Sequence, residues 1–222
     1  MGAIIRKVKR NFWLYQSCLF ILNSVRRIKG MGGVKIDNLG TGRLCVDSYG
    51  TGNIIKIGKD SSLQKVRVRI RGNGNVLEIN DNCKIGPKCS FWMEGNDIKI
   101  HVSRNTTFTH SVHFCAQENG TKIIVGEDCM FSNTITVRTS DSHPIYDIAT
   151  NDRLNQAKSI KIGSHVWIAP NSKIMKGANI GDGAVVGSNS MVTKDVPANT
   201  LAVGMPARVV KEGIKWTREK LF

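Results

Sequence analysis

His143 is the residue of this chain best suited to move a proton. It lies in the segment TSDSHPIYD, residues 139–147. An imidazole titrates near neutral pH, so it can take a proton from a hydroxyl group and pass it to a leaving group. Pro144 restricts the backbone of His143 and favours one direction for the ring. Asp141, two residues earlier, is a candidate to orient the imidazole. The segment therefore predicts general base catalysis.

This segment belongs to a long polar excursion that interrupts a regular repeat. Residues 138–161 fit no repeat and separate Val137 from Ile162. An irregular stretch of this length in a compact domain more often serves function than structure. We expect a long active-site loop that projects from a rigid scaffold.

The scaffold is indicated by aliphatic residues that recur at every sixth position. Such a residue cannot stay on one face of an α-helix, but it fits a chain that turns a triangular corner every six residues, with three short strands per coil. Small or β-branched residues follow four positions later and suit the inside of a corner. The repeat residues are Ile162, Ile168, Ile174, Ile180, Val186 and Val192, and the corner residues are Val166, Ser172, Ala178, Ala184, Ser190 and Val196. The pattern predicts an all-β solenoid, a parallel β-helix.

The repeat continues upstream with interruptions. Extra residues around 94–99 and 118–123 predict small bulges of Asn, Gly and Asp, and weaker repeats place the start of coiling near residue 34. The upstream repeat residues are Ile57 and Leu63; Ile79, Ile85 and Phe91; Val102, Phe108 and Phe114; and Val125, Phe131 and Val137. We expect a β-helix over residues 31–197, with the loop at 138–161 and a C-terminal tail over 198–222.

Composition fits one domain with a terminal attachment. The chain has 222 residues, 41% of them hydrophobic, which is enough for a continuous core. Its six cysteines form no close CxxC pair, and Cys83 and Cys129 fall at corner positions. Reduced, buried thiols in a cytoplasmic protein are expected.

The N-terminal residues contribute strongly to the formal charge of +15. Residues 1–30 contain Arg and Lys but no acidic residue, and their apolar residues recur at spacings of three and four, which predicts a short amphipathic α-helix. The apolar stretch is too short to span a bilayer, and no signal-peptide cleavage site follows it. Two roles stay open: a cap over the first coil, or a basic helix held at the anionic inner face of a membrane.

A second basic element is an alternating strand. Side chains alternate between the two faces of a strand, so all the cations of this strand lie on one face. That face is either simply solvated, which we slightly favour, or it attracts a polyanion. Nucleic acid is disfavoured because no nucleic-acid-binding module is recognised and few aromatic residues lie among the basic ones. The cations are Lys65, Arg67, Arg69 and Arg71, and the aliphatic residues between them are Val66, Val68 and Ile70.

Together, these motifs resemble the hexapeptide-repeat acetyltransferases. The resemblance rests on SHPIYD at 142–147, VWIAPN at 166–171, the hexads, and VTKDVPANTLAVGMPARVVK at 192–211. It is strongest to bacterial capsule O-acetyltransferases, including those that modify sialic-acid polymers, and more distant to galactoside and maltose acetyltransferases. It implies a left-handed parallel β-helix, a homotrimer with sites between subunits, and direct transfer of an acetyl group from acetyl-CoA to a carbohydrate hydroxyl, without a metal. The acceptor would be a capsular or lipopolysaccharide sugar, polyanionic or lipid-linked.

The resemblance also implies roles for individual residues. His143 would be the general base, Trp167 would line the tunnel for acceptor and cofactor, and the tail over 198–222 would close the CoA site. Asn133 and Asp141 are candidates to orient the acceptor, although an Asn at a corner is commonly a turn residue. The pantetheine arm would lie near Ala169, Gly187, Ser188, Thr193 and Lys194, and the nucleotide phosphates near Arg208 and Lys211.

Two other functions are compatible with the sequence. A zinc site of the carbonic anhydrase kind needs three imidazoles, and the chain offers His110, His113, His143 and His165, although their spacing matches no recognised pattern. A non-catalytic trimer that binds membrane or polyanion through its basic faces is the second. A sugar nucleotidyltransferase is disfavoured because the N-terminal stretch is too short for a nucleotide-binding domain.

Overall fold

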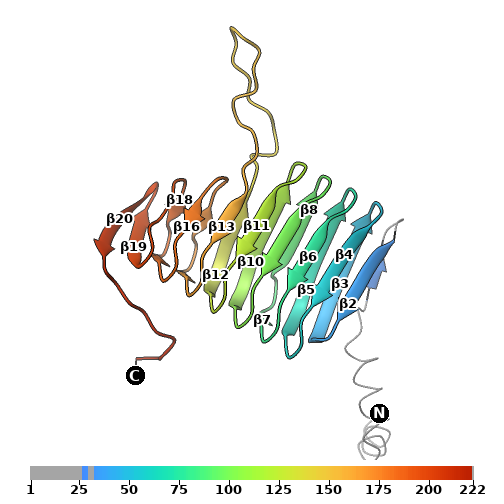
Figure 1. Ribbon diagram of the computed structural model, residues 1–222, viewed down its shortest axis with the longest axis horizontal. Helices are drawn as coiled ribbons and strands as arrows, with labels where there is room; N and C mark the ends of the chain where they lie inside the picture. The colour runs from blue at the N-terminus through green and yellow to red at the C-terminus, as the bar shows by residue number, and fades with distance from the viewer. Residues whose placement is uncertain (1–26, 30–32, 222) are drawn as a thin grey trace, which may run out of the picture.

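The described part of the protein is a solenoid of parallel strands. The computed structural model describes residues 27–29 and 33–221, and this part contains strands but no helix (Figure 1). The predicted all-β solenoid is therefore confirmed. The helix expected over 1–30 lies outside the described residues except for Arg27–Lys29. Those three residues form strand β1 and not a helix, because they pair with Cys45–Asp47 of the next coil.

The strands of this part form two hydrogen-bonded sheets, of 13 and seven strands. The seven-stranded sheet contains β2 (Val34–Asn38), β4 (Asn53–Ile57), β6 (Val76–Ile79), β9 (Lys99–Val102), β11 (Lys122–Val125), β13 (Ile160–Ile162) and β16 (Asn179–Ile180). The larger sheet contains β1, β3 (Thr41–Tyr49), β5 (Ser62–Arg71), β7 (Lys84–Ile85), β8 (Ser90–Glu94), β10 (Thr107–Gln117), β12 (Met130–Arg138), β14 (Trp167–Ile168), β15 (Lys173–Ile174), β17 (Val185–Val186), β18 (Met191–Val192), β19 (Thr200–Gly204) and β20 (Ala207–Glu212).

The larger sheet bends sharply along one line, so it forms two of the three faces that each coil presents. We call the lines where two faces meet edges. At this edge the chain turns through residues with positive φ, among them Lys65, Ser111 and Thr134. We call the face built on β7, β14, β17 and β19 the Trp167 face. The face built on β8, β15, β18 and the C-terminal halves of β3, β5, β10 and β12 is the arginine face. The third is the seven-stranded face.

Strand register explains the hexad repeat. Ile162 lies beside Ile180 and Ile168 beside Val186, so residues three hexads apart stack in one column. Upstream, Phe108 lies beside Phe131, since the extra residues lengthen each coil at its turns. All the predicted repeat and corner residues are buried, as the hexad pattern required.

Four phenylalanine rings fill the middle of the core. Phe91, Phe108, Phe114 and Phe131 are each at most 2% exposed, with ring centroids 4.6 to 6.2 Å apart. Burying each such side chain contributes roughly 1.5 to 3 kcal/mol. This packing gives the solenoid the stiffness that a projecting loop needs.

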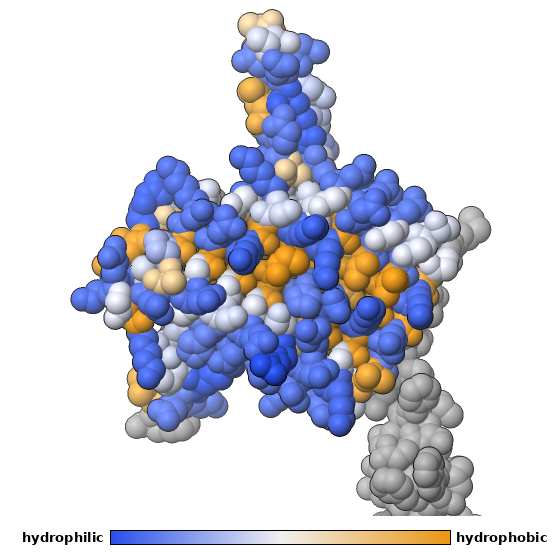
Figure 2. All heavy atoms as spheres, in the orientation of Figure 1, coloured by the Kyte–Doolittle hydropathy of each residue, from blue (hydrophilic) through white to orange (hydrophobic). Residues whose placement is uncertain are grey.

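The exposed parts of the solenoid differ in polarity. Figure 2 shows apolar side chains along the middle of the face turned to the viewer, with hydrophilic ones along both edges and over most of the loop. Cys83 and Cys129 are buried as predicted, and both are free thiols. Within residues 27–29 and 33–221, no helix is long and apolar enough to cross a bilayer.

The long loop and the C-terminal tail leave the solenoid on opposite sides (Figure 1). The loop runs from the end of β12 to β13, so it departs where the arginine face meets the seven-stranded face. The tail follows β20 and turns back along the solenoid.

Candidate active site

The loop is a narrow hairpin with its own hydrogen bonds. Tyr146 and Arg153 form an antiparallel bridge, and the Leu154 N–H donates to the Ile145 carbonyl over 2.8 Å. At the tip, Asp147 accepts backbone hydrogen bonds, which lower the pKa of its carboxyl. These bonds make the predicted excursion an ordered arm.

His143 lies near the base of this arm, and its backbone is fixed from both sides. The Asn155 side-chain amide donates to the His143 carbonyl over 2.8 Å, and its Oδ1 accepts from the Ile145 N–H over 2.7 Å. Asn155 is only 8% exposed, so these bonds are shielded from water. The His143 side chain is exposed and forms no hydrogen bond with the residues that the structure describes.

Asp141 does not form a hydrogen bond with the His143 ring. Its Oδ2 accepts from Lys176 Nζ and from Asn155 Nδ2, and these bonds lower the pKa of the carboxyl. Lys176 belongs to the next coil of the solenoid. Asp141 therefore ties the loop to the scaffold, a different contact from the one the sequence suggested.

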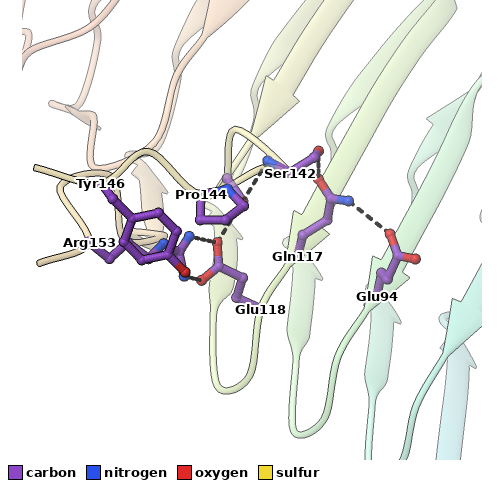
Figure 3. A pocket seen from close by; sticks show the side chains of 8 residues that line it. Glu94, Gln117, Glu118, Ser142, Pro144, Tyr146 and Arg153 are labelled. Carbon is purple, nitrogen blue, oxygen red and sulfur yellow. Dashed lines mark hydrogen bonds and ion pairs between the residues drawn. The ribbon is translucent and has the colours of Figure 1, made fainter. Parts of the chain in front are cut away.

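A second ion pair fixes the other side of the arm. Arg153 donates to both oxygens of Glu118, each over 2.7 Å, and this pairing lowers the pKa of Glu118 to about 2 (Figure 3). The Ser140 hydroxyl adds a bond of 2.6 Å to the same carboxylate.

A cavity of about 310 Å³ lies beside the base of the loop. It is lined by Glu94, Gln117, Glu118, Ser140, Ser142, Pro144, Tyr146 and Arg153 (Figure 3). Ser142 donates to Gln117, and Gln117 donates to Glu94, so one chain of hydrogen bonds crosses three coils. The two residues that flank His143 form part of this wall.

Trp167 lies on another side of the solenoid. Its half-buried indole points outward from β14, between Met130 and Val185 of the adjoining coils, and donates to Ser132 over 3.3 Å. The His143 loop departs from the edge opposite the Trp167 face. A single chain therefore does not bring His143 and Trp167 together.

Most of the residues expected near CoA lie along one edge. Asn171 donates its N–H to the Asn133 carbonyl, and Asn189 donates to Pro170, so three successive turns stack where the Trp167 face meets the arginine face. Ala169, Gly187, Ser188 and Arg208 lie along the same edge, because the Gly187 N–H donates to Ala202 and Arg208 lies opposite Val203. Thr193 and Lys194 follow β18 at a different edge, and Lys211 lies opposite Leu201 on the Trp167 face.

The C-terminal tail forms a cluster that the sequence pattern did not predict. Trp216 stacks on His165 with ring centroids 4.1 Å apart and lies 6.0 Å from Trp167. Burial acts to raise the pKa of Asp128, but hydrogen bonds from His165 and Arg218 outweigh it and leave that pKa lowered. The only local sign of this cluster is His165, which immediately precedes Val166 and Trp167. The residues that bond to His165, Asp128 and Trp216, are 37 and 51 positions away in the sequence.

The histidines considered as zinc ligands have separate surroundings. His113 bonds to Ser90, His110 to Ser111 and His165 to Asp128. No group of three or more His, Cys, Asp or Glu suited to a metal ion occurs among the described residues.

Comparison with known proteins agrees with this architecture. The family model for bacterial transferase hexapeptide repeats (six repeats) matches residues 159–194. The polysialic acid O-acetyltransferase of Neisseria meningitidis is 33% identical over 172 residues, 77% of this chain and 78% of that protein. That of Escherichia coli O1:K1 is 38% identical over 120 residues, 54% of this chain but only 38% of the E. coli protein. The crystal structure of the polysialic acid O-acetyltransferase OatWY is similar with a TM-score of 0.75 at 28% identity, covering 88% of this chain and 92% of that one.

Fold and similarities define an acetyltransferase built on a left-handed parallel β-helix. The chain belongs to the hexapeptide-repeat acetyltransferase family.

Proposed function

We propose that this enzyme transfers an acetyl group from acetyl-CoA to a hydroxyl group of an acidic surface polysaccharide, with sialic acid as the first acceptor to test. The observation that carries the proposal is the exposed His143 side chain on an arm whose backbone is pinned beside that residue. Family membership supplies the reaction class, and the relatives named polysialic acid O-acetyltransferases support the choice of acceptor.

His143 would act as the general base. It would take the proton of the acceptor hydroxyl while the hydroxyl oxygen attacks the thioester carbonyl, and would then give that proton to the departing sulfur. A positioned base of this kind contributes roughly 10² to 10⁴ in rate. Asn155 would act as a positioning residue, because it holds the peptide groups of His143 and Ile145 and leaves the imidazole free.

The edge between the Trp167 face and the arginine face fits the donor. When bound, acetyl-CoA supplies the activated acetyl group. Ser188 is exposed along this edge, next to Gly187, where a Cβ atom would come within 2.5 Å of the Val203 side chain. Arg208 is exposed at the end of the same edge and would offset phosphate charge.

We also propose that the active species is a homotrimer. His143 and Trp167 lie on opposite sides of one chain, so both would reach the same substrate only if the arm of one subunit meets the Trp167 face of its neighbour. Mixing His143→Ala and Trp167→Ala proteins after dissociation should then restore part of the activity. Light scattering that finds an active monomer would contradict the trimer.

The reaction itself is tested by thioester consumption over a panel of neutral glycosides, sialic acid and polysialic acid. We expect turnover with the sialylated acceptors and a loss of about 10² to 10⁴ in kcat for His143→Ala. His101→Ala is the control, since His101 faces outward from β9 on the seven-stranded face, away from the edge proposed for the donor, and it should retain activity. Equal turnover by wild type and the His143 variant would refute the mechanism.

A further inference from the structure

The arginine face presents guanidinium groups that form no hydrogen bond or ion pair with the side chains that the structure describes. Arg67 and Arg69 are exposed on β5, because Val66, Val68 and Ile70 fill the core side of that strand. Neither guanidinium bonds to another side chain through a hydrogen bond or ion pair within residues 33–221. The predicted alternation is confirmed for these arginines, whereas Lys65 lies at the edge, where the chain turns.

An indole fixes one of these arginines against the surface. The Arg69 guanidinium lies over the Trp92 ring, 4.9 Å from its centroid. The Trp92 N–H is buried and has no hydrogen-bond partner among the described residues. A guanidinium held over an aromatic ring loses less side-chain freedom when it binds an anion. The pair therefore offers prearranged donors and no acceptor.

Register connects these donors to the catalytic arm. One ladder across the face runs through Arg69, Trp92, Cys115 and Arg138, and the next through Arg67, Ser90, His113, Thr136 and Lys173. Neighbouring strands are about 4.8 Å apart, so three steps separate the backbones of Arg69 and Arg138 by roughly 14 Å. Arg138 donates to the Ser140 carbonyl and the Ser142 hydroxyl, immediately before His143.

Two acidic residues lie on the described strands of this face. Asp47 pairs with Arg71 over 2.8 Å, whereas Glu94 accepts a hydrogen bond from the neutral amide of Gln117 and keeps its charge. The cations Arg67, Arg69, Arg138 and Lys173 outnumber Glu94, so the excess charge along the path from β5 to the base of the arm is positive. A ligand complementary to such a surface is extended, carries repeated carboxylates, and is long enough to cross several coils.

We propose that the arginine face is a binding surface for a segment of an anionic glycan chain whose terminal part reaches the catalytic arm. This inference rests on the proposed function, because it takes the bound chain to be the acceptor. Arg67 and Arg69 bind carboxylates several sugars away from the reacting hydroxyl. The enzyme consequently prefers polymeric acceptors to single sugars.

The test uses the Arg67→Gln/Arg69→Gln double variant of the full chain. We expect its KM for polysialic acid to rise about tenfold at low salt, with kcat and the KM for single sialic acid unchanged. Polysialic acid with its carboxyl groups reduced should bind wild type as weakly as the native polymer binds the variant. The Lys56→Gln/Lys161→Gln variant is the control, since both lysines are exposed on the seven-stranded face. An unchanged KM in the arginine variant, or an equal rise in the lysine variant, would overturn the proposal.

Direct binding separates this inference from the proposed reaction. Fluorescence polarisation with labelled polysialic acid should show binding to His143→Ala protein and about tenfold weaker binding when both arginines are also replaced. If the wild type bound polysialic acid without turning it over, the proposed reaction would be contradicted, whereas the proposed binding surface would still be supported. Equal binding by the two proteins would contradict the surface whatever the turnover.

Discussion

The ion pair between Glu118 and Arg153 allows a quantitative prediction for the Glu118→Gln variant. The pairing lowers the pKa of Glu118 from 4.5 to about 2. At 1.36 kcal/mol per pKa unit this corresponds to about 3 kcal/mol as an upper limit. The Glu118 side chain is 32% exposed, and screening by water reduces the figure to about 1 to 2 kcal/mol. We expect the arm, and not the solenoid, to lose this stability.

Native-state hydrogen exchange measures the loss. The backbone amides of Ile145 and Leu154 should lose protection by a factor of about 5 to 30 in Glu118→Gln protein, while amides of the core strands keep theirs. Glu94→Gln is the matched control, because Glu94 lines the same cavity but bonds to Gln117 and not to Arg153. Unchanged protection in the Glu118 variant, or equal losses in both variants, would refute the reasoning.

The pH dependence of the same ion pair has a defined sign. The pKa of Glu118 is lower in the folded than in the unfolded chain, so the stabilisation is fully present above about pH 4.5 and is lost as the pH falls towards about 2. Protection of the wild-type arm should therefore be the same at pH 7 and pH 5, after correction for intrinsic exchange. It should approach that of Glu118→Gln only near pH 2.

Three further predictions concern the core, the arm and the tail. Phe131→Ala should lower the free energy of unfolding, measured by urea denaturation, by about 3 to 5 kcal/mol, because the Phe131 ring is fully buried against Phe108 and Phe114. The control Met130→Ala should lower it by under about 1 kcal/mol, because the Met130 side chain points outward. Asn155→Ala should reduce kcat about 10 to 100-fold with little change in the KM for acetyl-CoA, and a proportional rise in that KM would argue against a positioning role. Asp128→Asn should speed tryptic cleavage after Arg218 several-fold, because Asp128 bonds to both Arg218 and His165. Asp195→Asn is the control, and equal cleavage rates in the two variants would show that other contacts hold the tail.

The sequence by itself determined the scaffold. The period of six in residues such as Ile162, Ile168 and Ile174 is a direct consequence of three faces per coil, so the buried columns could be predicted without coordinates. The alternation of Arg67 and Arg69 with Val66 and Val68 likewise fixed which side chains face water. The gap between Val137 and Ile162 located the loop, because an excursion is visible wherever a strict repeat fails.

Only the tertiary structure decided how the loop is held and what surrounds it. Asp141 was expected near the imidazole but pairs with Lys176, which is 35 positions away, and Glu118 meets Arg153 across the same separation. The stacking of Trp216 on His165 spans 51 positions. Such pairings depend on how coils of unequal length bring their turns into register. No local periodicity encodes which of these distant residues meet. The hydrophobic pattern therefore predicts the solenoid, whereas the polar contacts that hold the backbone of His143 are seen only in the folded chain.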